Sequence, residues 1–326
     1  MHLLVTGAAG FVGSHLVDAL LRAKHHVTVI DNFDPFYERP IKERNIAEHR
    51  RSQLWQLIEL DLRDLDGLRR RLTHGYDAIV HLAAKAGVVP SIDDPAGYQE
   101  VNVTGTLNLL ELARERGIRQ FVFASSSSVY GMNPRVPWSE HDHVLQPISP
   151  YASTKVSAEL LGHVYSQLYG IRFLALRLFT VYGPRQRPDL AIHRFARLML
   201  AGRRVPVHGD GRSMRDYTFV EDIVSGIVSA VDYTATMYEV INLGNNRAIA
   251  LADMLRELET ALGVRATIDR LPERPGDVPR TWANIDKART LLGYEPHTPF
   301  SVGVRRFVDW YRTQCAAKVA AIGTLT

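Results

Sequence analysis

The segment "VTGAAGFVGSHL", residues 5–16, constrains the fold most, because it puts three glycines between a strand pattern and a helix pattern. Gly7, Gly10 and Gly13 have the spacing GxxGxxG. Gly7 permits a tight turn, Gly10 lets the backbone approach a pyrophosphate, and Gly13 allows close packing of helix on strand. Free N–H groups at the helix start favour an anion. The segment therefore predicts a cradle for a dinucleotide.

Short apolar runs alternate with amphipathic segments through the first half of the chain. The runs read "HLLVTG", "HVTVID", "LWQLIELDL", "DAIVHLAA" and "QFVFASSS", and "EVINLG" follows much later. Such runs are typical of buried parallel strands, so we predict a doubly wound α/β sheet. Residues 33–52 form a long, partly helical excursion at the sheet edge. Prolines and the "GDG" at residues 209–211 indicate irregular loops between residues 184 and 211, and later helices complete a smaller lobe.

Composition narrows the class of protein. The 326 residues carry a formal charge of +4, and the basic residues are scattered, which favours solvated surfaces over nucleic-acid binding. The single cysteine, Cys315, excludes a disulfide within the chain and favours a cytoplasmic setting. We expect no membrane span and no signal peptide, because the apolar runs are too short. No metal site is predicted.

Acidic residues follow the second and third strands. Asp31 ends the second strand, where a carboxylate accepts bonds from ribose hydroxyls and repels a 2′-phosphate. This favours NAD over NADP. Asp61, after the third strand, is either an adenine contact or a strand-end cap.

The motif "YASTK" places Tyr151 and Lys155 four residues apart on a predicted helix, so both point the same way. Pro150 fits a helix start. A tyrosine that acts as a general base needs its pKa lowered from about 10, and a nearby ammonium does this. An exposed tyrosine and lysine on a solvated face is the alternative.

Several motifs occur in one order across nearly the whole chain: "TGAAGFVG", Asp31, "HLAA", "VNVTGT", "SSSSVYG", "YASTK", "VYGPRQRPD", "RDYTFVEDI" and "RPGD". Together they resemble the extended short-chain dehydrogenase/reductase family, in its nucleotide-sugar epimerase and dehydratase branch. The resemblance implies a Rossmann sheet, a tightly held NAD, a UDP- or dTDP-sugar substrate and a homodimer. We assign residues 1–178 and 217–245 to an NAD-binding domain, and 179–216 and 246–326 to an interwoven substrate domain.

The resemblance also implies roles for individual residues. Ser126, Tyr151 and Lys155 correspond to the catalytic set, and Asn102 to an asparagine near the cofactor. The expected cofactor contacts are Gly7, Gly10, Phe11, Val12, Gly13, Asp31, Asn32, Asp61, Leu62, Leu82, Ala83, Ala84, Asn102, Tyr151 and Lys155. Arg215, Arg274 and Asp277 match positions that hold the UDP phosphates and ribose. Lys85 stands where related uronate epimerases often have glutamine, and its role is left open.

The residues beside Ser126 bear on the reaction. Dehydratases and decarboxylases that resemble this chain carry acids here, whereas this sequence has Ser127 and Ser128. A hydroxyl is a poor general base near neutral pH, so we expect C4 oxidation followed by re-reduction, which is 4-epimerisation. A lyase and a non-catalytic NAD-binding protein remain alternatives.

The sugar preference depends on Thr180 and Arg185. Thr180 replaces an asparagine common in galactose-type epimerases, and this variant resembles UDP-glucuronate 4-epimerases. A carboxylate at C6 needs donors, which Ser127, Ser128, Thr180 and Arg185 can supply, and Arg187 lies in the same loop. We expect conversion of UDP-glucuronate to UDP-galacturonate. The alternative is UDP-glucose or UDP-N-acetylglucosamine, with these residues around a neutral 6-hydroxyl.

Overall fold

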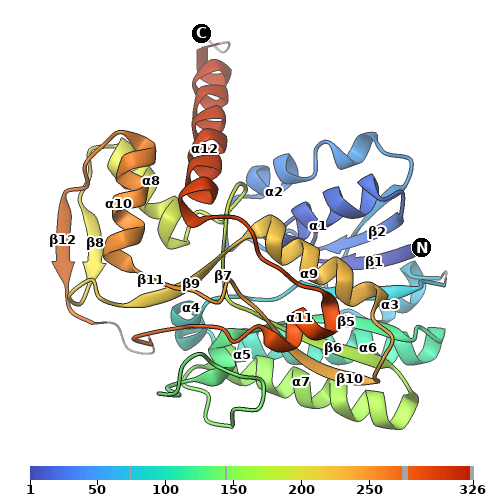
Figure 1. Cartoon of the computed structure of the whole chain (residues 1–326). Coiled ribbons are helices and arrows are strands. Elements are labelled where there is room, and N and C mark those ends of the chain that lie inside the picture. The colour runs from blue at the N-terminus through green and yellow to red at the C-terminus, as the bar shows by residue number, and fades with distance from the viewer. Residues whose placement is uncertain (74, 144, 274–277, 324–326) are drawn as a thin grey trace.

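A parallel sheet of seven strands forms the centre of the computed structural model, which describes residues 1–73, 75–143, 145–273 and 278–323, with side chains to residue 314 (Figure 1). Every neighbouring pair is parallel. The strands, in order across the sheet, are β10 (Tyr238–Leu243), β6 (Arg172–Leu178), β5 (Gln120–Ser126), β4 (Ala78–His81), β1 (His2–Thr6), β2 (His26–Asp31) and β3 (Trp55–Glu59). The predicted doubly wound fold is confirmed.

Helices cover both faces of this sheet, which is why its strands are apolar on both sides. One face carries α1 (Phe11–Arg22) and α9 (Val220–Asp232), with α11 (Asp286–Leu292) against α9 and β10. The other carries α3 (Leu65–Arg71), α6 (Gly105–Arg116) and α7 (Pro150–Tyr169). Within the described ranges, no helix is long and apolar enough to cross a bilayer.

Shorter elements connect the strands at the edge where the site lies. The excursion after β2 contains α2 (Arg39–Asn45) and a 3-10 turn (His49–Arg51), as predicted. After β4 come α4 (Val88–Asp93), α5 (Pro95–Gln99) and a π-helical turn (Glu100–Thr104) that leads into α6. A 3-10 turn (Ser127–Tyr130) follows β5.

In the part of the chain that the structure describes, the smaller lobe contains two short sheets and three helices (Figure 1). One sheet joins β7 (Thr180–Tyr182), β9 (Met214–Phe219) and β11 (Ala248–Ala250), and the other joins β8 (Val205–His208) and β12 (Ile268–Leu271). The helices are α8 (Ala191–Leu200), α10 (Leu251–Leu262) and α12 (Phe300–Gly323).

The prediction of irregular loops between residues 184 and 211 was wrong in part, because α8 and β8 lie there. The buried side chains Ile192, Phe195, Ala196 and Met199 have helical spacing between the prolines at 188 and 206. The prolines therefore flank α8 on either side and do not prevent it from forming.

Candidate active site

A cavity of ≈ 550 Å³ opens at the carboxyl ends of the strands of the large sheet, where ligands of doubly wound folds bind. Most of the predicted site residues line it. They are Gly7, Gly10, Phe11, Val12, Gly13, Asp31, Asn32, Asp61, Leu62, Leu82, Ala83, Ala84, Ser126, Ser127, Ser128, Tyr151, Lys155 and Thr180.

The glycine turn after β1 leaves no room for side chains. Gly7 has φ +72, and a Cβ on it would lie 2.6 Å from the backbone nitrogen of Ala83. A Cβ on Gly13 would lie 2.3 Å from the carbonyl oxygen of Gly7. No described side chain caps the start of α1, so its N–H groups stay available to a phosphate. The turn fits the pyrophosphate of a dinucleotide.

Asp31 is buried at the end of β2 and is held by the backbone. Its two carboxylate oxygens accept hydrogen bonds from the N–H groups of Ala9 and Phe33, each at 2.9 Å. Burial raises the pKa of Asp31, while the bond from Phe33 and the charge of Lys42 lower it. The carboxylate is therefore fixed in orientation beside the cavity, as recognition of a ribose diol requires.

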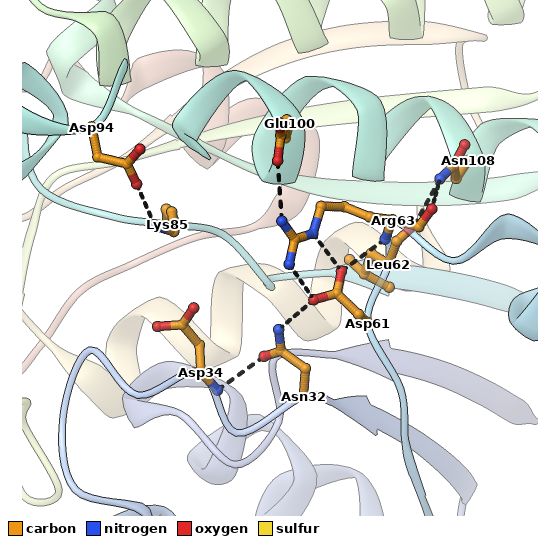
Figure 2. Close-up of polar contacts among 9 residues, drawn as sticks. All are labelled: Asn32, Asp34, Asp61, Leu62, Arg63, Lys85, Asp94, Glu100 and Asn108. Atoms are coloured by element: carbon orange, nitrogen blue, oxygen red, sulfur yellow. Dashed lines mark hydrogen bonds and ion pairs between the residues drawn. The ribbon is translucent and has the colours of Figure 1, made fainter. Parts of the chain in front are cut away.

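Asp61 lies between Asn32 and Arg63 (Figure 2). Oδ1 accepts from the backbone N–H and Nε of Arg63 at 2.9 and 3.0 Å, and Oδ2 accepts from Nη2 of Arg63 and Nδ2 of Asn32 at 3.0 and 2.9 Å. The Arg63 guanidinium holds the pKa of Asp61 at about 2. A carboxylate has about four acceptor positions, so Asp61 is already saturated.

An aromatic strap formed by residues 33–42 contributes Asp34, Phe36, Tyr37 and Lys42 to the lining of the cavity, and no sequence pattern indicated this role. Lys42 Nζ donates to the carbonyl oxygen of Asp34 at 2.7 Å and lies 4.7 Å from the ring centroid of Tyr37. The guanidinium carbon of Arg187 lies 5.3 Å from the ring centroid of Phe36. The strap thus connects the cofactor end of the cavity to the loop that carries Arg187.

The predicted catalytic residues come from β5 and the start of α7. Ser149 caps α7 by accepting a bond from the N–H of Ala152 at 3.2 Å, which fixes the first turn. Ser126 Oγ donates to Ser128 Oγ at 3.1 Å. Lys155 Nζ donates to the carbonyl oxygen of Ala124 at 2.7 Å.

The electrostatics of this set are dominated by burial. Burial raises the pKa of Tyr151, while its hydrogen bond with Ser126 and the charge of Arg187 lower it. Burial also lowers the pKa of Lys155 to about 7, and Glu159 opposes that change. Arg187 is thus the cation that lowers the pKa of Tyr151.

Asn102 lies behind the cavity rather than on its wall. Its Oδ1 accepts from the N–H of Lys85 at 2.8 Å, and its Nδ2 donates to the carbonyl of Lys85 at 2.9 Å and to Thr154 Oγ1 at 3.0 Å. It therefore ties the loop after β4 to α7. Lys85 itself lines the cavity and pairs with Asp94 at 2.5 Å (Figure 2).

Arg185 and Arg187 point in different directions. Arg185 has a positive φ of 62° and pairs with Asp18 of α1 at 2.7 Å, and it lines neither cavity described here. Arg187 lines the large cavity and pairs with Asp189 at 2.8 Å. Of the two arginines, Arg187 therefore lines the large cavity, whereas Arg185, which was expected to face the substrate, does not.

A second cavity of ≈ 300 Å³ adjoins the first, because Thr180 and Leu190 line both. Arg215 lies on its wall, with His208 and Tyr217. Arg274 and Asp277 lie outside the described residues. The arrangement places Thr180 at the junction between a nucleotide cradle with a Ser–Tyr–Lys set and a separate polar pocket.

Comparison with known proteins agrees with this geometry. The family described as GDP-mannose 4,6 dehydratase matches residues 4–307, so the chain belongs to this family of extended short-chain dehydrogenase/reductases.

Within the family it is similar to UDP-glucuronate 4-epimerases. The enzyme from Thermodesulfobacterium geofontis is 38% identical over 310 residues, which are 94% of this chain and 95% of that one. The crystal structure of UDP-glucuronic acid 4-epimerase from Bacillus cereus with UDP-glucuronic acid and NAD has a TM-score of 0.90 at 38% identity, covering 96% and 100%. The UDP-glucose 4-epimerase of Thermotoga maritima with UDP-glucose has a TM-score of 0.89 at 32% identity, covering 97% and 100%.

Proposed function

We propose that this protein interconverts UDP-glucuronate and UDP-galacturonate by NAD-dependent epimerisation at C4. The observation that carries the proposal is the shared cavity, into which the glycine cradle and Ser126, Tyr151 and Lys155 all open. Serines at 127 and 128 stand where an eliminating enzyme needs a carboxylic acid. The similarity to enzymes that bind UDP-glucuronic acid and NAD supports it.

The residues divide the chemistry between them. Tyr151 takes the proton of the sugar 4-hydroxyl, and Ser126 donates a hydrogen bond to the same oxygen. Lys155 binds the nicotinamide ribose and keeps a positive charge near Tyr151. Bound NAD supplies a hydride acceptor for C4. Tyr151 then returns the proton when the 4-keto group is reduced from its other face, so C4 inverts with no net redox change.

We assign the C6 carboxylate to Arg187, Thr180, Ser127 and Ser128. These side chains all line the large cavity and offer a cation and three hydroxyl donors. A 4-keto uronate is a β-keto acid, which loses CO₂ when its carboxylate stands perpendicular to the carbonyl plane. Several fixed donors hold the carboxylate away from that geometry.

The test is product analysis with purified protein and UDP-glucuronate or UDP-glucose in separate reactions. We expect UDP-galacturonate from the first and much slower turnover of the second. Turnover of UDP-glucose alone supports the neutral-sugar alternative, which the Thermotoga maritima relative represents. Release of CO₂ as the main outcome would establish a lyase.

The UDP moiety is assigned to the second cavity. Arg215 on its wall, with Arg274 and Asp277, binds the phosphates and ribose in this proposal. We also propose the domain division at residues 1–178 with 217–245, and 179–216 with 246–326, so that the reacting sugar lies between the two units.

We further propose a cytoplasmic homodimer that associates through α7. Leu160, Val164 and Leu168 recur every four residues on this helix and are 56%, 45% and 66% exposed. Three large apolar side chains on one exposed stripe are typical of a helix-pair interface. The single cysteine in the chain agrees with a reducing compartment.

A further inference from the structure

A buried ion pair lies behind the catalytic residues and has no part in the mechanism above. The side chains of Arg177 and Glu159 are only 4% and 5% exposed. Arg177 Nε donates to Oε1 of Glu159 at 2.9 Å, and its Nη2 donates to Oε2 at 2.7 Å. Removing two charges from water costs more than such a pair usually returns in stability. Its position beside the site therefore suggests a role in the reaction.

Glu159 continues the row of reacting residues along α7. Tyr151, Lys155 and Glu159 follow at intervals of four, so they lie on one face of the helix. Each also contacts the end of β5. Tyr151 bonds to Ser126, Lys155 donates to the carbonyl of Ala124, and Ser125 Oγ donates to Glu159 Oε1 at 2.5 Å.

Arg177 fixes the Glu159 carboxylate from the neighbouring strand. In the parallel register of β5 and β6, Arg177 is the partner of Ser125, so both reach Glu159 from adjacent positions. The guanidinium also lies 4.8 Å from the ring centroid of Tyr130, which restrains its plane. With three donors on its oxygens, two of them from the Arg177 guanidinium, the Glu159 carboxylate is held in one orientation.

We propose that Glu159 is a positioning residue that keeps Lys155 charged and fixes the strand end carrying Ser126. The consequence for catalysis rests on the proposed function. The effect of Glu159 on the charge of Lys155 does not depend on it. Lys155 is buried, with Nζ 4.7 Å from the ring centroid of Phe123, so its ammonium needs an anion nearby.

Among the residues that the structure describes, the other titratable groups around this row do not supply that anion. His81 on β4 is buried and its pKa is lowered to about 3, so it is neutral at pH 7. Arg177 is a cation, and Tyr130, Tyr151 and Tyr238 have pKa values raised by burial. Glu159 is the anion that opposes the effect of burial on the Lys155 pKa.

The direct test is a titration of Lys155 by NMR in protein labelled with ¹³C-lysine, with NAD added. The chain has six lysines, so a Lys155→Met variant assigns the signal. In Glu159→Gln we expect the Lys155 pKa to fall by about one unit, because a carboxylate within one helical turn is lost. No substrate is needed, so the result is independent of which sugar the enzyme accepts.

Glu159→Gln also leaves Arg177 without its partner, so the loss of the Glu159 charge has to be measured in a protein that lacks the Arg177 guanidinium as well. Arg177→Met and the double variant Glu159→Gln/Arg177→Met both lack the buried guanidinium, and we expect the Lys155 pKa to be lower in the double variant by a similar amount. Glu239→Gln is the matched control, because Glu239 pairs with Lys287 at 2.6 Å. It should change the Lys287 signal and leave Lys155 unchanged.

The pH profile of kcat/KM, measured with whichever UDP-sugar is turned over, gives the catalytic readout. In Glu159→Gln the alkaline limb, where Lys155 loses its proton, should move to lower pH by about one unit. An unchanged Lys155 titration in Glu159→Gln overturns the proposal, as does a change that disappears in the Arg177→Met background. A shifted titration with an unshifted alkaline limb overturns only its catalytic consequence.

Discussion

The two ends of the large cavity are built in different ways. The cofactor end is formed largely by backbone atoms, and Gly7 and Gly13 there have no space for a Cβ. The sugar end consists of side chains from loops far apart in the sequence, such as Thr180 and Arg187. Substitutions should therefore act through geometry at the first end and through charge and hydrogen bonding at the second, with Tyr151 between them.

The largest effect on turnover is expected at Tyr151, between the two ends of the cavity. Tyr151→Phe removes the proposed base, so turnover should fall by about 10³-fold while NAD stays bound. Product formation and the NAD content of the purified variant measure both. Turnover near that of the unchanged protein would contradict the assignment of Tyr151.

At the cofactor end, Gly13→Ala should weaken NAD binding without changing sugar preference. The added Cβ meets the Gly7 carbonyl oxygen, so α1 has to move, at a cost of about 1–3 kcal/mol. NAD retention and the ratio of activities on the two UDP-sugars are the measurements. Gly75→Ala controls for a general effect of glycine loss, because a Cβ on Gly75 would meet no atom within 4 Å. A changed ratio of activities on the two UDP-sugars in Gly13→Ala would contradict the separation of the cofactor end from the sugar end.

At the sugar end, Arg187→Met should change the sugar preference without weakening NAD binding. Loss of a charge-assisted contact costs about 2–3 kcal/mol, so kcat/KM for UDP-glucuronate should fall by about 100-fold, and less for UDP-glucose. Arg185→Met is the matched control from the same loop, because Arg185 pairs with Asp18 instead. Equal losses on both sugars would show that Arg187 does not recognise the carboxylate.

The smallest effect concerns acid sensitivity at the cofactor end. His81 bonds to Thr6 and Thr106, and burial lowers its pKa from 6.5 to about 3. The unfolded chain thus binds an extra proton between these values, so stability falls as pH drops through this window. The His81 contribution is about 2 kcal/mol at pH 5. Urea unfolding at pH 7 and pH 5 should show a smaller drop in His81→Gln, and an equal drop would exclude His81 as the cause.

The same contrast explains what the sequence predicts well. The cofactor end depends on a local succession of strand, glycine turn and helix. Its residues can therefore be recognised in the sequence, in "VTGAAGFVG" and at Asp31. Six of the seven strands of the large sheet follow from apolar runs in the same way, whereas β6 was not among the predicted runs. Even there, the sequence does not reveal that hydrogen bonds from Arg63 and Asn32 occupy the acceptor positions of Asp61, because these bonds depend on side-chain conformations.

The sugar end was predicted less well because it depends on tertiary contacts. Arg185 and Arg187 are two residues apart in one loop, and a backbone with positive φ at Arg185 decides which of them faces the cavity. The strap with Phe36 and Tyr37 lies in a proline-containing, charged segment without periodicity. The chemistry of a carboxylate predicts which residue types should bind it, but only the folded loop shows which of two neighbouring arginines lines the cavity.

The position of β10 has a consequence for engineering. This edge strand comes from residues 238–243, after several elements of the smaller lobe, and its whole length pairs with residues 173–178 of β6. A chain cut before it would leave β6 with an open hydrogen-bonding edge, which invites aggregation. Relatives with other sugar preferences therefore cannot be combined by exchanging two halves at one crossover. A chimaera needs several crossovers that keep β6 and β10 from the same parent.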